Sequence, residues 1–235
     1  MEYYFTNKEN VRGRKLFIIG NEAHHLYQVL RKRTGEDIFV TDGERNLYKT
    51  VIEKIATNRI ECTIIESFYN VNEREKEIIL YQSLLKNPAR FEFVIEKATE
   101  LGVFEIVPIK TENVVNKTTD KTERWQSIAL SAMKQSQRCY LPKVCPPIGF
   151  TEALEKLKSN SIKLIAHEKK DDYSLQINDL KLKDNIRSVF IGPEGGFTQK
   201  EVDDAVSNGF RILNLGKRKL RSETSAILAV GLLLN

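Results

Sequence analysis

A glycine-rich stretch, "GPEGGFTQKE" at 192–201, combines a flexible turn with a carboxylate and could form part of a ligand site. Thr198 and Glu201 form the T-x-x-E pattern of a capping box, so we expect a helix to begin at about Gln199, directly after the glycines. Such a helix start can bind an anion, yet the stretch matches no phosphate-binding signature and carries Glu194 where a phosphate would arrive. A neutral or cationic ligand therefore fits better than a phosphate; the alternative is a glycine turn that only redirects the chain.

A second stretch, "LGKRKLRSETSAIL" at 215–228, concentrates basic residues before a hydroxyl-rich helix start. Ser222 is a candidate N-cap, and Glu223 would interact favourably with the helix dipole. One interpretation is a basic loop followed by a capped helix. The other is an RNA-facing loop from which Arg221 and Glu223 reach the site formed by the glycines. The basic residues assigned to RNA in that interpretation are Lys217, Arg218 and Lys219.

The overall composition favours an anionic partner. The 235 residues include 37 Lys and Arg against 32 Asp and Glu, which gives a net charge of +5, and the sequence pI is about 9.0. A second basic cluster consists of Arg31, Lys32 and Arg33, which we expect to contact RNA phosphates; ordinary surface charge is the alternative.

Secretion, membrane insertion and metal binding are not indicated. The N-terminus has no apolar leader, and the longest apolar run, "AILAVGLLL" at 226–234, is about half of the roughly 20 residues that a membrane-spanning helix needs. Cys62, Cys139 and Cys145 have no metal-ligand spacing. We therefore expect a cytoplasmic protein with reduced thiols and no metal.

The periodicity predicts an α/β protein with two domains. Short β-branched and aromatic runs separated by turn signals predict a small β-barrel over residues 1–71. One helix interrupts them at 21–31, with Asn21 as N-cap and Leu26, Val29 and Leu30 on its apolar face. From residue 72 to 235, strands alternate with helices, which is typical of a parallel sheet.

Ligands of parallel sheets bind beyond the carboxyl ends of the strands. Three loops occupy that position: "AHE" at 166–168, "GPEGG" at 192–196 and "LGKRKLR" at 215–221. We therefore expect them to converge on one site. Trp125 has helical spacing with Ile128, Ala129 and Ala132, which indicates a core residue rather than a ligand contact; a further helix is expected over 151–160.

Four motifs together carry a family resemblance: "KATELGV" at 97–103, "RWQSIALSAMKQSQR" at 124–138, "IGPEGGFTQKE" and "LGKRKLRSETSAIL". In this order they resemble the ribosomal RNA small subunit methyltransferase E family of the SPOUT superfamily. The N-terminal "HHLYQVLRKRTGEDIFVTDG" is similar to the PUA-like RNA-binding domain of that family. The resemblance runs over almost the whole chain.

The resemblance implies methylation of N3 of a uridine in 16S ribosomal RNA of the small subunit, with S-adenosyl-L-methionine (SAM) as methyl donor. It also implies a homodimer, and a deep trefoil knot in residues 72–235. The cofactor would be held by backbone groups and apolar side chains of the three converging loops. The residues so implicated are Ala166, His167, Ile191, Gly192, Pro193, Gly195, Gly196, Leu215, Gly216, Leu220 and Ser225.

The chemistry of the reaction suggests roles for three charged residues. Uridine N3 becomes a nucleophile once it loses its proton, and Arg221 is our candidate for stabilising the resulting negative charge. Glu223 or Glu194 would orient the base or accept the proton. The alternatives are another SPOUT methyltransferase that acts on transfer RNA or a ribose 2′-hydroxyl, and a non-catalytic RNA-binding protein, which would not need the glycine and basic loops.

Three positions depart from the family pattern. Lys217 stands where the family has proline, Lys134 where it has an acidic residue, and Gln137 where it has glycine. The first departure alters a cofactor loop. The other two lie in the helix before "YLPKV", where they affect fine substrate geometry more than the class of reaction.

Overall fold

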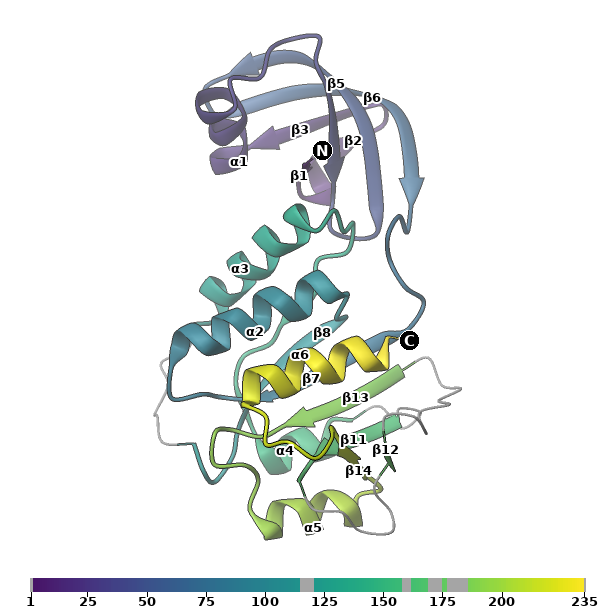
Figure 1. Cartoon of the computed structure of the whole chain (residues 1–235). Helices are drawn as coiled ribbons and strands as arrows, with labels where there is room; N and C mark the ends of the chain where they lie inside the picture. Colours follow the sequence, from purple (N-terminus) through teal and green to yellow (C-terminus); the bar gives the residue numbers. More distant parts are fainter. Residues whose placement is uncertain (1, 115–120, 158–161, 169–174, 177–185, 235) are drawn as a thin grey trace. The chain divides into compact units, whose positions relative to one another are not determined.

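The computed structural model describes residues 2–114, 121–157, 162–168, 175–176 and 186–234 (Figure 1). It divides into two compact units. The first unit comprises Met1–Glu73 and Leu130–Leu141, and the second comprises Arg74–Ala129 and Pro142–Asn235. A domain boundary at residue 72 stays a prediction, and the sequence did not indicate that a segment as distant as Leu130–Leu141 joins the first unit.

The first unit is built on a six-stranded sheet with the strand order β1-β4-β5-β6-β3-β2. Its strands alternate between core and surface: in β3, Leu16 and Ile18 are fully buried while Lys15 and Ile19 are exposed. This is the β-rich first domain that the sequence predicts. Its elements are β1 (Tyr3–Phe5), η1 (Lys8–Asn10), β2 (Val11–Arg12), β3 (Lys15–Ile19), α1 (Gly20–His24), η2 (His25–Val29), β4 (Asp37–Thr41), β5 (Asn46–Ala56) and β6 (Arg59–Tyr69).

The helix of the first unit differs from its prediction. The N-cap is Ile19, so Asn21 lies inside α1, and the chain continues into the π-helical turn η2. In η2 the Leu30 N–H donates to the His25 carbonyl, five residues back. Leu26 is fully buried, whereas Val29 is 61% exposed. The expected apolar face was wrong because a π-helical turn is wider than an α-helical one, which moves residues three and four apart onto different faces.

A buried ion pair fastens the segment Leu130–Leu141 to the rest of the first unit. The Glu73 carboxylate accepts hydrogen bonds from the Arg138 guanidinium at 2.8 Å, from the Cys139 N–H at 3.0 Å and from the Tyr140 N–H at 3.0 Å. Both charged side chains are at most 5% exposed. The Glu73 side chain thus organises a turn that lies far from it in sequence.

Two departures from the family pattern have a structural counterpart in the same segment. Gln137 adopts φ = +57°, the left-handed conformation that glycine reaches without strain. Lys134 donates to the Glu22 carboxylate at 2.7 Å. The glycine expected from the family pattern at position 137 would therefore adopt this backbone conformation without strain, and Lys134 has an acidic partner in this chain.

The second unit contains an eight-stranded parallel sheet with the order β10-β8-β7-β13-β11-β14-β12, and β9 pairs with β8. The prediction of a parallel α/β fold is confirmed. Its elements are β7 (Glu77–Ser83), α2 (Pro88–Leu101), β8 (Glu105–Lys110), α3 (Thr122–Gln135, whose last residues belong to the first unit), β9 (Lys143–Val144), β10 (Ile148–Gly149), α4 (Phe150–Glu155), β11 (Ile162–Ala166), β12 (Leu175–Gln176), β13 (Ile186–Ile191), α5 (Gln199–Ser207), β14 (Arg211–Asn214) and α6 (Ser222–Leu233).

Helices cover the sheet of the second unit. Helices α2 and α6 pack side by side (Figure 1), and α4 and α5 supply apolar side chains to the core around Phe190. Trp125 is 2% exposed and packs against Phe91, which confirms its assignment to the core. Helix α4 ends at Glu155, so the helix predicted to residue 160 was too long; residues 158–160 lie outside the described part. In the described residues, no helix is long and apolar enough to cross a membrane.

Candidate active site

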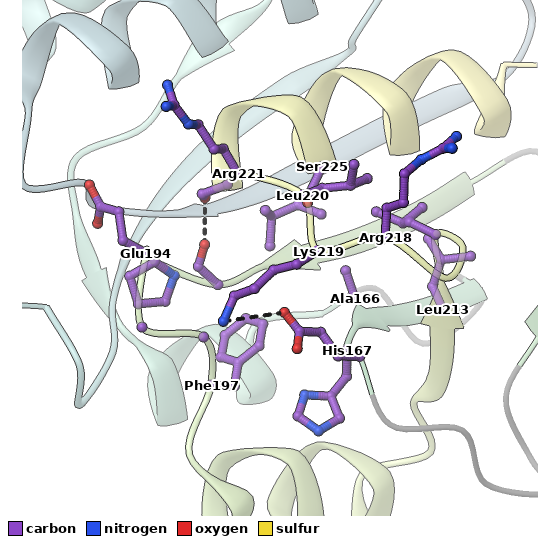
Figure 2. A pocket seen from close by; sticks show the side chains of 18 of the residues that line it. Ala166, His167, Glu194, Phe197, Leu213, Arg218, Lys219, Leu220, Arg221 and Ser225 are labelled. Atoms are coloured by element: carbon purple, nitrogen blue, oxygen red, sulfur yellow. Dashed lines mark hydrogen bonds and ion pairs between the residues drawn. The ribbon is translucent and has the colours of Figure 1, made fainter.

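A pocket of about 560 Å³ lies at the carboxyl ends of β11, β13 and β14 (Figure 2). Three segments form its walls. They are the end of β11 with residues 167–168, the end of β13 with residues 192–197, and residues from the segment 215–222 after β14. Because these strands run parallel, their carboxyl ends meet at one edge of the sheet. The prediction that three separate loops converge is confirmed.

Most of the residues that the sequence singled out line this pocket. They include Glu194, Arg218, Lys219 and Arg221. Lys217 and Glu223 do not line it. All residues implicated in cofactor binding do: Ala166, His167, Ile191, Gly192, Pro193, Gly195, Gly196, Leu215, Gly216, Leu220 and Ser225. The pocket also has lining residues that sequence reasoning missed, namely Arg90, Glu168, Phe197, Leu213 and Ser222.

The glycine loop is shaped by its backbone and by the helix that follows it. Both hydrogen bonds of the predicted capping box are present between Thr198 and Glu201, and α5 begins at Gln199 as expected. Gly196 has φ = +71°, and a Cβ atom there would meet nothing within 4 Å. The loop thus exposes its backbone at this point, and a side-chain-bearing residue there would strain it.

Glu194 ties the glycine loop to the segment before α2. Its carboxylate accepts the backbone N–H of Lys86 at 3.1 Å, while the residue also lines the pocket. In Figure 2 its side chain lies at the edge of the pocket, away from His167 and Ala166. Glu194 therefore has a structural contact beyond the turn itself.

Ser222 is not the N-cap of α6. That position belongs to Arg221, without a side-chain capping bond. The Ser222 hydroxyl instead donates to the Gly192 carbonyl at 2.5 Å and accepts from Gln82 Nε2 at 3.0 Å. Because these two hydrogen bonds occupy the hydroxyl, it attaches the start of α6 to the glycine loop and does not cap its own helix.

Charges surround the pocket on several sides. Arg221 is exposed, and its guanidinium makes no hydrogen bond or ion pair within the described part of the chain. Lys219 Nζ lies 3.9 Å from Glu168 Oε1 (Figure 2). Glu223 Oε1 lies 3.8 Å from Arg90 Nε. Glu223, which was expected to reach the site, therefore approaches it only through Arg90.

The three thiols are not candidate nucleophiles. None lines the pocket, and burial raises the pKa of Cys62 to about 12, of Cys139 to about 11 and of Cys145 to about 12. At neutral pH they are therefore protonated and weakly reactive. No group of three His, Cys, Asp or Glu side chains in the described ranges is placed to hold a metal ion.

The basic cluster Arg31, Lys32 and Arg33 belongs to the first unit. Arg31 and Arg33 are exposed, whereas Lys32 donates to the Glu36 carboxylate at 2.9 Å. That hydrogen bond raises the pKa of Lys32 and lowers that of Glu36. Neither arginine forms an ion pair within the described residues, although the charge of Arg33 also contributes to the lowered pKa of Glu36, while the charge of Lys32 is compensated by its contact with Glu36.

Comparisons with known proteins agree on one family. The chain matches a model described as an RNA methyltransferase domain over 72–234 and one described as an RNA methyltransferase PUA domain over 18–65. A ribosomal RNA small subunit methyltransferase E of Mesomycoplasma hyopneumoniae is 34% identical, over 97% of this chain and 96% of the relative.

Two solved structures extend the likeness to the fold. The ribosomal RNA small subunit methyltransferase E of Neisseria gonorrhoeae, bound to S-adenosyl methionine, has a TM-score of 0.88 and 31% identity, covering 98% of this chain and 95% of that chain. A Legionella pneumophila protein in complex with SAM has a TM-score of 0.86 and 29% identity, covering 98% and 96%.

Proposed function

Because the chain belongs to the ribosomal RNA small subunit methyltransferase E family, we propose that it transfers a methyl group from SAM to N3 of a uridine in 16S ribosomal RNA of the small subunit. The observation that carries this proposal is the pocket formed by three loops at the carboxyl ends of β11, β13 and β14. The likeness to the relatives spans both units, so it covers the RNA-binding domain as well as the pocket.

The residues of the pocket fit SAM. Leu213, Leu215 and Leu220 offer an apolar wall, and the loop at 192–196 offers backbone groups with open space at Gly196. Such a surface, with Glu194 at its edge, suits an adenosine and a cationic sulfonium group better than it suits a phosphate. When bound, SAM supplies a methyl group that is already activated by the sulfonium.

The protein's own residues must align the uridine and handle its proton. Deprotonated uracil carries negative charge on N3 and its flanking carbonyl oxygens, and Arg221 on the pocket wall is the cation that we assign to it. Of the two carboxylates considered for the proton, Glu194 lines the pocket and Glu223 does not. This favours Glu194 as the group that orients the base or accepts the proton, directly or through water.

The reaction product tests the function. The protein is incubated with methyl-labelled SAM and small subunits that lack the modification, and the digested RNA is analysed for modified nucleosides. We expect 3-methyluridine. A methyl group on a ribose, or on transfer RNA in a competing assay, would replace the proposal by another SPOUT activity, and RNA binding without methyl transfer would favour a non-catalytic role.

Substitution Gly195→Val tests the cofactor wall. A Cβ atom at this position would lie 3.3 Å from the Asn113 Cβ, and Asn113 Nδ2 donates to the Gly196 carbonyl at 3.0 Å. A valine would displace this contact and the loop with it. We expect calorimetry to show at least about tenfold weaker SAM binding, with the α5 control Lys200→Ala unchanged. Wild-type affinity in Gly195→Val would remove the loop from the cofactor site.

Charge removal at residues 31–33 tests the RNA-binding role of the first unit. Each phosphate contact that is lost should reduce the slope of log affinity against log salt by about one. We expect this for Arg31→Ala and Arg33→Ala in RNA-binding titrations. Lys32→Ala should have a smaller effect because Lys32 is paired with Glu36. An unchanged slope in both arginine variants would contradict direct phosphate contacts by the arginines. An equally large effect of Lys32→Ala would show that its pairing with Glu36 does not keep Lys32 from the RNA.

The family also supports a homodimeric, cytoplasmic protein with ribosomal subunits as its substrate. We propose this assembly for the chain, and sedimentation at micromolar concentration tests it. The trefoil knot describes how the chain threads through itself, and it stays a prediction. Lys217, where the family has proline, does not line the pocket, so its effect on cofactor binding is expected to be small.

A further inference from the structure

We propose that Arg90 binds a phosphate group of the RNA next to the target uridine, and that Glu223 orients the Arg90 side chain for this contact. The inference rests on the proposed function, because it takes RNA as the substrate of this pocket. It gives Glu223 a positioning role in place of the proton transfer considered from the sequence.

The first observation is the position of Arg90 and the availability of its donors. Arg90 lies in the first turn of α2 and lines the pocket, and 38% of its side chain is exposed. Its Nε atom is 3.8 Å from Glu223 Oε1, beyond hydrogen-bonding distance. Among the described residues the guanidinium makes no hydrogen bond. Its five N–H donors therefore remain available to a ligand in the pocket.

The second observation is the environment of Glu223. Its side chain is 12% exposed, and its Oε2 atom is buried without a hydrogen-bond partner in the described part of the chain. A buried carboxylate is costly unless a nearby positive charge compensates it. Arg90 and the N-terminal end of α6 supply that charge. The same attraction holds the Arg90 guanidinium at the wall of the pocket.

The chemistry of the site favours a phosphate as the ligand of Arg90. A guanidinium presents parallel N–H donors that match two oxygens of one phosphate. The apolar wall and the glycine loop account for the cofactor, and Arg221 accounts for the charge on the uracil. Lys219 lies 3.9 Å from Glu168, but both of these side chains are more than two-thirds exposed, so solvent screens the pair and it holds neither side chain in place. The acidic neighbour of Arg90 is only 12% exposed, and it therefore holds the guanidinium at the pocket wall with its donors available to a phosphate.

The first experiment compares Arg90→Ala with Arg124→Ala. Arg124 is the matched control. It forms an ion pair with Glu92, which lies in α2 as Arg90 does, but Arg124 itself lies outside the pocket. We expect Arg90→Ala to raise KM for undermodified small subunits roughly tenfold and to lower the salt slope of RNA binding by about one. For Arg90→Ala we expect kcat and the Kd for SAM to stay within about twofold of wild type. Arg124→Ala should match wild type in KM, kcat, salt slope and the Kd for SAM.

Three results would overturn the assignment. Weaker SAM binding in Arg90→Ala would make Arg90 a cofactor contact, and a lower kcat with unchanged KM would place it on the reacting base. Unchanged kinetics would remove it from the site. If wild-type protein binds small subunits but forms no 3-methyluridine, the proposed function fails, while the RNA-binding titration still tests Arg90.

A double-mutant cycle tests Glu223 as a positioning residue. Glu223→Gln keeps the shape of the side chain but removes its charge. We therefore expect it to raise KM several-fold when Arg90 is present and to have little further effect when it is combined with Arg90→Ala. Arg90→Lys should rescue only part of the loss, because an ammonium lacks the bidentate geometry. A lower kcat in Glu223→Gln that persists in Arg90→Ala would instead identify Glu223 as a group acting on the proton.

Discussion

Arg221→Ala is expected to lower kcat for uridine methylation by about 100-fold or more, with SAM affinity within about twofold of wild type. The reason is that Arg221 is assigned to negative charge that develops on the uracil only when N3 loses its proton, and removal of one such donor costs about 10²–10³ in kcat. Its backbone carbonyl accepts the Ser225 N–H at 2.9 Å, a bond that alanine preserves. The side chain itself is exposed, so the variant should fold.

The measurement separates chemistry from binding. Single-turnover methylation of undermodified small subunits gives the rate of the chemical step, and calorimetry gives Kd for SAM. Arg211→Ala is the matched control, because Arg211 is an exposed arginine at the opposite end of β14. A normal turnover rate in Arg221→Ala would disprove the assigned role, and a loss explained by weaker SAM binding would move Arg221 to the cofactor site.

The parts of the site that sequence predicts are those governed by local rules. Thr198 and Glu201 are three residues apart, and a capping box needs nothing beyond that spacing, so the start of α5 was predicted correctly. The three loops could be brought together because parallel strands share one carboxyl edge. The family resemblance then supplied the residue roles, which periodicity alone does not contain.

The parts that sequence missed depend on contacts between distant segments. Arg90 precedes the glycine loop by about a hundred residues, and only the packing of α2 beside α6 brings it next to Glu223. Ser222 has the sequence signature of an N-cap, but the Gly192 carbonyl competes for its hydroxyl. No local signal could have shown either. The position of Arg90 depends on helix packing, and the contact of Ser222 is a tertiary hydrogen bond that overrides a local capping preference.

The segment Leu130–Leu141 is the largest such omission, and its attachment is concentrated in one residue. Glu73 accepts the Arg138 guanidinium and two consecutive backbone N–H groups, and both charged side chains are at most 5% exposed. Residues 130–141 and the first 73 residues form one compact unit. The stability of that unit should therefore depend on the Glu73 carboxylate.

Glu73→Ala is accordingly expected to lower the free energy of unfolding of the first unit by about 3–5 kcal/mol, because it leaves the Arg138 charge buried without its partner. Glu61→Ala is the control: it removes an ion pair with Lys15 on the exposed surface of the same unit and should cost at most about 1 kcal/mol. Urea unfolding, monitored by hydrogen exchange of the β3 and β6 amides, measures the free energy of unfolding of each variant. Equal stability of the two variants would show that other contacts hold residues 130–141. A loss of stability confined to Glu73→Ala, with unchanged SAM affinity in the second unit, would show that this single carboxylate holds the segment.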